Sequence, residues 1–157
     1  MKIAQYLPEE AIIPTLTVSN KLEALRHMLR AMNALGYLSD PAQAEHDLLT
    51  REARMTTGIG HGIAVPHART ASVTALHAVL ARHADGLDWA ALDGRPVHFI
   101  LLALSPSDAP GPHLQFVASM ARLMHDGEVY ASLLAAPTAR RMHGIVSPPK
   151  RKGLFRP

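Results

Sequence analysis

The chain has 157 residues, of which 48% are hydrophobic and 4% aromatic, and this composition fits one globular domain with an aliphatic core. Its lack of cysteine excludes disulfide bonds, thiolate metal sites and cysteine nucleophiles. The net charge of +3 comes from the C-terminal tail, because four of the 16 basic residues lie in the last eight positions. The rest of the chain has 12 basic and 13 acidic residues, so nucleic-acid binding is not expected.

Two amphipathic helices are predicted in the first third of the chain. Apolar side chains recur at helical spacing over residues 20–35, with Asn20 as the capping residue and Gly36 as the stop. Pro41 fits the first turn of a second helix that extends to about Glu52, because a proline there loses no helical hydrogen bond.

Three strands are predicted in the middle of the chain, after a glycine-rich loop. Residues 63–65 and 76–82 combine β-branched and other apolar side chains and read as short strands. The run VHFILLAL at residues 97–104 is too apolar for a half-exposed strand. We expect it to be a central strand that is covered on both faces.

The last third of the chain is predicted to be helical. Residues 110–112, Pro-Gly-Pro, indicate a turn, and the apolar spacing from residue 113 to the stop near residue 127 predicts an amphipathic helix. Shorter helices are expected at about 128–135 and 138–145. Helices on either side of a mixed sheet indicate an α/β fold, an α+β sandwich with a small mixed β-sheet flanked by helices on both faces.

The domain organisation follows from the same pattern. One domain is expected over residues 1–146, with residues 147–157 as a basic, disordered tail. The first twenty residues lack the apolar core of a secretion signal, and no apolar stretch is long enough to span a membrane. We therefore expect a cytoplasmic protein that does not insert into membranes.

The glycines at positions 58, 60 and 62 raise the question of nucleotide binding. The later glycine of the dinucleotide fingerprint is missing, and no Gly-Lys-Ser/Thr follows. In both nucleotide motifs the loop comes after a strand and opens a helix, whereas this loop precedes a strand. The sequence argues against a nucleotide site, and a tight turn is the simpler interpretation.

The histidine after this strand is the main candidate for chemistry. Pro66 ends the strand and holds Val65 extended, so that His67 is mounted on a stiff backbone. An imidazole with a pKa of about 6.5 is neutral enough at pH 7 to attack an electrophile and is a good leaving group afterwards. This suits reversible phosphoryl transfer, although a histidine after a proline is also common as an ordinary surface residue.

These residues resemble a known family. Glu52, six further residues and then IGHGIAVPHA from Ile59 to Ala68 are similar to the active-site signature of the fructose/mannitol-type enzyme IIA proteins of the bacterial phosphotransferase system. Looser similarity runs from about residue 3 to 146, and it includes an Arg-Glu pair before the glycines and an HLQ triplet that opens a late helix. The resemblance implies the sandwich fold described above.

The resemblance also implies an activity. The chain is expected to be a phosphotransferase with a transient phosphohistidine, in which His67 accepts a phosphoryl group from an HPr-like phosphocarrier protein. His113 is expected to lie beside it and to stabilise the phosphoryl group. No cofactor and no metal are expected, because donor and acceptor are both histidines and the energy change is small.

Four further expectations concern the surroundings of His67. His113 falls in the first turn of a predicted helix, where the dipole favours an anion. Arg51 and Thr57 are candidates to stabilise the phosphoryl group by charge and by a hydroxyl hydrogen bond, although they could also be a solvated cation and a loop cap. A zinc site of His61, His67 and His113 lacks a fourth ligand and is not favoured. We expect the partner surface around His67 to be apolar.

The downstream partner is open at this point. A regulatory, nitrogen-related IIA that binds target proteins is preferred, because no IIB or IIC sequence is present in the chain. His61 and Gln115 instead resemble the mannitol branch, so a sugar-specific IIA that passes the phosphoryl group to a separate IIB is the alternative. A binding module that is never phosphorylated is a third interpretation.

Overall fold

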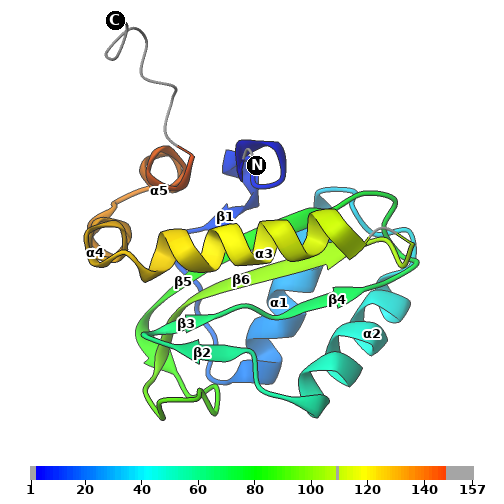
Figure 1. The fold of residues 1–157 in the computed structure, drawn as a ribbon, viewed down its shortest axis with the longest axis horizontal. Coiled ribbons are helices and arrows are strands. Elements are labelled where there is room, and N and C mark those ends of the chain that lie inside the picture. The colour runs from blue at the N-terminus through cyan, green and yellow to red at the C-terminus, as the bar shows by residue number, and fades with distance from the viewer. Residues whose placement is uncertain (1–2, 109, 148–157) are drawn as a thin grey trace, which may run out of the picture.

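A six-stranded mixed sheet lies between helices in the computed structural model, which describes residues 3–108 and 110–147 (Figure 1). The strands are β1 (Ile12–Ile13), β2 (Gly58–Gly60), β3 (Ile63–Ala64), β4 (His67–Arg69), β5 (His77–Leu87) and β6 (Val97–Ser105). The helices are α1 (Lys21–Ala34), α2 (Pro41–Arg54), α3 (Pro110–His125), α4 (Gly127–Ala135) and α5 (Ala139–Val146), with short 3-10 helices at Ile3–Gln5 and Glu9–Ala11. The expected tail falls mostly on residues 148–157, which lie outside the described residues.

Strand β6 is the centre of the sheet. The strand order is β1-β5-β6-β3-β2, and β4 pairs with β6 beside β3. Strands β5 and β6 are antiparallel, whereas β3 and β4 run parallel to β6. All but one of the residues of β6 are buried, which confirms the prediction of a doubly covered central strand.

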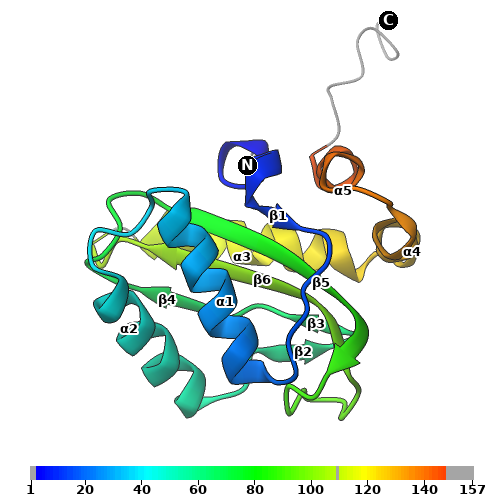
Figure 2. The same ribbon diagram turned by 180° about the vertical axis from the view of Figure 1, so that it is seen from behind.

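Helices cover both faces of this sheet. Helices α1 and α2 lie on one face and α3 on the other, as the front and back views show (Figures 1 and 2). Helices α4 and α5 follow α3 beyond the edge of the sheet, where α5 packs near β1. The predicted fold, a small mixed sheet flanked by helices on both faces, is confirmed.

The first two helices begin as the sequence predicts. The Asn20 side chain accepts from the backbone N–H of Glu23 at 2.9 Å, and the Glu23 carboxylate accepts from the Ser19 N–H at 2.8 Å. Asp40 caps α2 in the same way through the Gln43 N–H. Each cap satisfies backbone donors that the first helical turn leaves free.

The structure differs from the prediction at two boundaries and in the number of strands. Helix α3 begins at Pro110, so the segment 110–112 belongs to the first helical turn and is not a separate turn. Strand β5 continues to Leu87 instead of ending near residue 82, with an irregular register in its second half. The short strands β1, β2 and β4 were not predicted, because two or three residues are too few to show a period of two.

The glycine-rich stretch is a β-hairpin. Gly60, His61 and Gly62 all have positive φ, at 93°, 57° and 77°, and they connect β2 to β3. A Cβ on Gly62 would collide with the Tyr130 hydroxyl, and a Cβ on Gly58 would lie 2.8 Å from Ala91. The glycines therefore serve tight backbone geometry and close packing, as in the simpler of the two interpretations.

Candidate functional site

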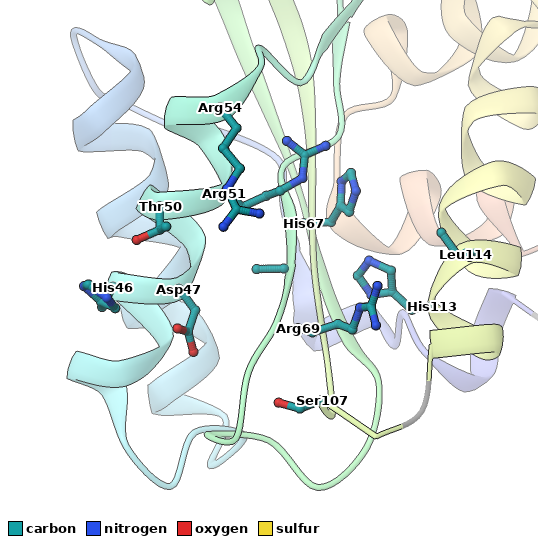
Figure 3. A pocket seen from close by; sticks show the side chains of 11 residues that line it. His46, Asp47, Thr50, Arg51, Arg54, His67, Arg69, Ser107, His113 and Leu114 are labelled. Carbon is teal, nitrogen blue, oxygen red and sulfur yellow. The ribbon is translucent and has the colours of Figure 1, made fainter.

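A cavity of about 550 Å³ opens between α2, β4 and the start of α3 (Figure 3). The described residues that line it are His46, Asp47, Thr50, Arg51, Arg54, His67, Ala68, Arg69, Ser107, His113 and Leu114. The cavity therefore contains both histidines that the sequence singles out, together with three arginines and one carboxylate.

The two histidines face the same space from different elements. His67 is the first residue of β4, and His113 lies in the first turn of α3. Their ring centroids are 5.1 Å apart and the rings are tilted by 49° (Figure 3). His67 is partly exposed, whereas His113 is 3% exposed. The arrangement gives one accessible imidazole with a second, sheltered imidazole beside it.

The backbone around Pro66 holds His67 in place. Strand β3 ends at Ala64, and Pro66 separates it from β4, so His67 opens a second parallel strand instead of following the last one. The Pro66 carbonyl accepts from the Ala103 N–H of β6 at 3.0 Å. Both segments are thus anchored to the central strand, which makes the backbone under His67 rigid.

A hydrogen bond defines the tautomer of His67. Its Nδ1 lies 2.7 Å from the Val65 carbonyl oxygen. A carbonyl only accepts, so Nδ1 carries the proton and the neutral ring keeps a lone pair on Nε2. Burial is the main cause that lowers the pKa of His67, the Val65 hydrogen bond raises it and the charge of Arg51 lowers it. The ring is therefore neutral at pH 7, as a nucleophile must be.

His113 is held neutral more strongly. Burial, followed by the neighbouring His67, Arg69 and Arg51, lowers its pKa from 6.5 to about 4. Its Nδ1 lies 2.6 Å from the hydroxyl oxygen of Ser105, which is completely buried. Each cause disfavours a positive charge on the ring, so His113 is neutral at pH 7 in the ligand-free protein.

Arg51, a candidate for binding phosphoryl oxygens, lines the cavity. Arg54 and Arg69 join it, and the sequence analysis had assigned neither to the site. Within the described residues no carboxylate lies within ion-pair distance of these three guanidinium groups. Alternation along β4 places Arg69 on the same side as His67, a signal that depends on recognising the strand.

The surface around His67 is more cationic than predicted. Leu114 is the large apolar side chain exposed at the cavity, with 61% of its area accessible. The other side of the cavity is formed by α2 with its arginines (Figure 3). The expectation of an apolar surface is therefore wrong on the α2 side, where charge dominates.

The structure contradicts the expected contact between Thr57 and a phosphoryl group. Thr57 is 3% exposed and does not line the cavity. Its hydroxyl lies 2.8 Å from Oε2 of Glu52, to which it donates, and it accepts from the Trp89 indole N–H at 3.1 Å. The hydroxyl hydrogen is therefore already in use inside the core.

His61 is not brought to the other two histidines. It lies in the β2–β3 turn, where its ring meets that of His125 with centroids 4.4 Å apart. Among the residues that the structure describes, no group of three or more His, Cys, Asp or Glu side chains is placed to hold a metal ion. The zinc site of His61, His67 and His113 is therefore not assembled.

Comparison with known families gives this site a context. The sequence model of the family "Phosphoenolpyruvate-dependent sugar phosphotransferase system, EIIA 2" matches residues 5–147. The chain belongs to this family. It is thus related to the EIIA components of phosphoenolpyruvate-dependent phosphotransferase systems, a family that implies phosphoryl transfer.

Individual EIIA proteins show the extent of the similarity. A nitrogen regulatory protein of Bradyrhizobium diazoefficiens is 32% identical over 149 residues, which cover 95% of this chain and 97% of that protein. The fructose-specific EIIABC component of Bacillus subtilis is 31% identical over 147 residues, 94% of this chain but 23% of that longer protein. The crystal structure of the nitrogen regulatory protein IIA-Ntr from Neisseria meningitidis superposes with a TM-score of 0.85 at 28% identity, over 92% of this chain and 98% of that one.

In the described part of the chain, no helix of this EIIA domain is both long enough and apolar enough to cross a membrane.

Proposed function

We propose that this EIIA protein accepts a phosphoryl group on Nε2 of His67 from an HPr-like phosphocarrier protein and passes it on or signals with it. The hydrogen bond from His67 Nδ1 to the Val65 carbonyl carries this proposal, because it leaves Nε2 as the unprotonated nitrogen of a partly exposed ring. The neighbouring His113 and the arginines supply the groups that a phosphoryl anion requires.

The transfer step exchanges one N–P bond for another. The lone pair on His67 Nε2 attacks the phosphorus of the donor phosphohistidine, and the electrons of the donor N–P bond return to the donor ring nitrogen. The His67 ring keeps its Nδ1 proton and becomes more positive as the bond forms. The Val65 carbonyl stabilises that charge, because it accepts a hydrogen bond that strengthens as the ring becomes cationic.

The cavity supplies positive charge to the phosphoryl oxygens. The arginines at positions 51, 54 and 69 line the space that His67 faces. Guanidinium groups suit phosphoryl oxygens because they remain charged and donate several hydrogen bonds. We assign the role of binding the phosphoryl group to Arg51 and Arg69, since their charges already act on the neighbouring His113.

For the step after phosphorylation we propose a regulatory role through target proteins. The relative named as a nitrogen regulatory protein matches this chain over nearly the full length of both, and the superposed IIA-Ntr structure does the same. The fructose-specific relative supports the second candidate, a sugar-specific IIA that donates to a IIB protein. Transfer from the phosphorylated chain to a purified fructose-type IIB would favour this second candidate.

The experiment that tests phosphorylation uses enzyme I, an HPr-type carrier and phosphoenolpyruvate. We expect intact-mass spectrometry to detect one acid-labile phosphoryl group on the wild-type protein and none on His67→Ala or His67→Gln. The variant His27→Gln, which changes a histidine on α1 outside the cavity, is the matched control and should be phosphorylated normally. A wild-type protein that stays unmodified, or a His67→Gln variant that is still phosphorylated, would overturn the proposal and favour a binding module.

A further inference from the structure

Ser105 is a buried polar residue at the end of the central strand, and it contacts His113 of the site. It is the last residue of β6, its exposure is 0%, and its register partner on β4 is Arg69. The Ser105 carbonyl accepts from the Thr70 N–H at 2.9 Å, which fixes the backbone at this point. Its hydroxyl oxygen lies 2.6 Å from Nδ1 of His113.

The direction of this hydrogen bond follows from what else the hydroxyl can do. A neutral imidazole carries one N–H, so either Ser105 donates to Nδ1 or Nδ1 donates to Ser105. Among the described residues Ser105 Oγ has no other hydrogen-bond partner. If Nδ1 donated, the buried serine hydrogen would have no acceptor among the residues that the structure describes, which is unfavourable. If the hydroxyl donates, both groups are satisfied.

We propose that Ser105 is a positioning residue that holds His113 in the tautomer with its proton on Nε2. The neutral His113 ring then donates a hydrogen bond from Nε2 to an oxygen of the phosphoryl group on His67. This second part rests on the proposed function, whereas the tautomer itself does not. The two imidazoles are thus fixed in opposite tautomers, His67 by the Val65 carbonyl and His113 by the Ser105 hydroxyl.

Opposite tautomers give each ring a different role. His67 has its lone pair on Nε2 and can form the N–P bond, whereas His113 has a proton there and can only donate. A neutral donor also holds the phosphoryl group less tightly than an imidazolium would, because charge-assisted hydrogen bonds are about twice as strong. Onward transfer to the next protein therefore stays accessible.

The tautomer is tested on the unphosphorylated protein. We expect long-range ¹H–¹⁵N spectra of the imidazoles at pH 7 to show the His113 proton on Nε2 in the wild type. In Ser105→Ala the spectra should show a substantial Nδ1–H population, and Ser105→Thr, which keeps a hydroxyl, should restore the wild-type pattern. Ser72→Ala removes another buried serine hydroxyl and should leave His113 unchanged.

Backbone ¹H–¹⁵N spectra establish that each variant is folded. A wild-type ring with its proton on Nδ1, or a tautomer that is the same in the wild type and in folded Ser105→Ala, would overturn the proposal. Neither result depends on whether His67 is phosphorylated.

The role in transfer is tested separately. With a phosphorylated HPr-type carrier, the rate of His67 phosphorylation should fall about five- to tenfold in Ser105→Ala, as expected for the loss of one neutral hydrogen bond, and recover in Ser105→Thr. A changed tautomer with an unchanged rate would overturn the assignment of His113 as a donor to the phosphoryl group. Absence of phosphorylation in the wild type would overturn the proposed function. The imidazole spectra would still decide whether Ser105 sets the tautomer of His113.

Discussion

At the scale of single residues, burial decides the protonation of His113. The ring is almost inaccessible, and its neighbours His67, Arg69 and Arg51 disfavour a further positive charge. The same cause, desolvation, lowers the pKa of the more exposed His67. Both imidazoles therefore remain neutral under conditions in which a free histidine begins to protonate.

The stability of the fold should depend on pH through His113. Because the pKa of His113 is 6.5 for an unperturbed side chain and about 4 in the folded protein, the unfolded chain binds a proton more readily than the folded one between these values. The stabilisation is fully present above pH 6.5 and is lost as the pH falls towards 4, by up to about 3 kcal/mol.

Urea unfolding at several pH values, together with an NMR titration of His113, measures this effect. The free energy of unfolding should fall more steeply below pH 6.5 in the wild type than in His113→Asn, and the ring should remain neutral at pH 5.5. An ordinary titration midpoint near pH 6.5 would contradict the prediction.

At the scale of the elements, one buried carboxylate joins two helices to the segment that leads into β2. Glu52 near the end of α2 pairs with Lys21 of α1 at 2.6 Å and accepts from the backbone N–H of Thr57 at 3.1 Å. The Thr57 hydroxyl links the same carboxylate to Trp89, over whose ring the Lys21 ammonium lies at 5.2 Å. The cluster fixes α2, and with it Arg51, relative to the hairpin of β2 and β3.

Replacing the Thr57 hydroxyl should lower the stability of the fold without preventing the phosphorylation of His67. Thr57→Val leaves the indole N–H without an acceptor and the carboxylate with one donor fewer, so the free energy of unfolding should fall by about 2–3 kcal/mol in urea titrations. Thr57→Ser keeps the hydroxyl and should stay within about 1 kcal/mol of the wild type.

The same pair of variants tests the role of Thr57 in transfer. Since Thr57 does not line the cavity, folded Thr57→Val should still be phosphorylated on His67 at nearly the wild-type rate. A large loss of phosphorylation in folded Thr57→Val would contradict this prediction and would indicate that Thr57 contacts the phosphoryl group directly.

At the scale of the whole molecule, charge is unevenly distributed. Outside the last eight residues the chain has a formal charge of −1, yet three arginines gather at one cavity. An excess of one sign of charge in a cleft attracts ligands of the opposite sign and makes their association depend on salt. The cavity should therefore favour small anions as well as the phosphoryl end of a protein donor.

Phosphoramidate, a small anionic phosphoryl donor, tests the effect of these arginine charges without a protein partner. Reversing one charge near the cavity changes the energy of a monovalent anion by about 1 kcal/mol at low ionic strength, so Arg54→Glu should slow His67 phosphorylation roughly fivefold. Arg30→Glu, on the exposed side of α1, should have little effect. A rate in Arg54→Glu that equals the wild-type rate at low salt would contradict this prediction.

Some features of the site follow from local sequence. The cap of α1, the proline in the first turn of α2, the apolar run of β6 and the break at Pro66 each depend on a few neighbouring residues, and the structure has them where they were predicted. The pairing of His67 with His113 was expected from a motif resemblance, and the rings are indeed adjacent. Arg69 was missed because β4 exists only through its pairing with β6.

The sequence by itself determined the elements with strong periodicity, the family, and which histidine follows a rigid backbone, because these depend on residues that are adjacent in the chain. Tertiary structure alone decided that Thr57 faces Glu52, that Arg69 joins the cavity and that Ser105 meets His113. The physical reason is that a hydroxyl or guanidinium group has no fixed partner along the chain. Its partner depends on which distant groups the packed sheet brings within hydrogen-bond distance.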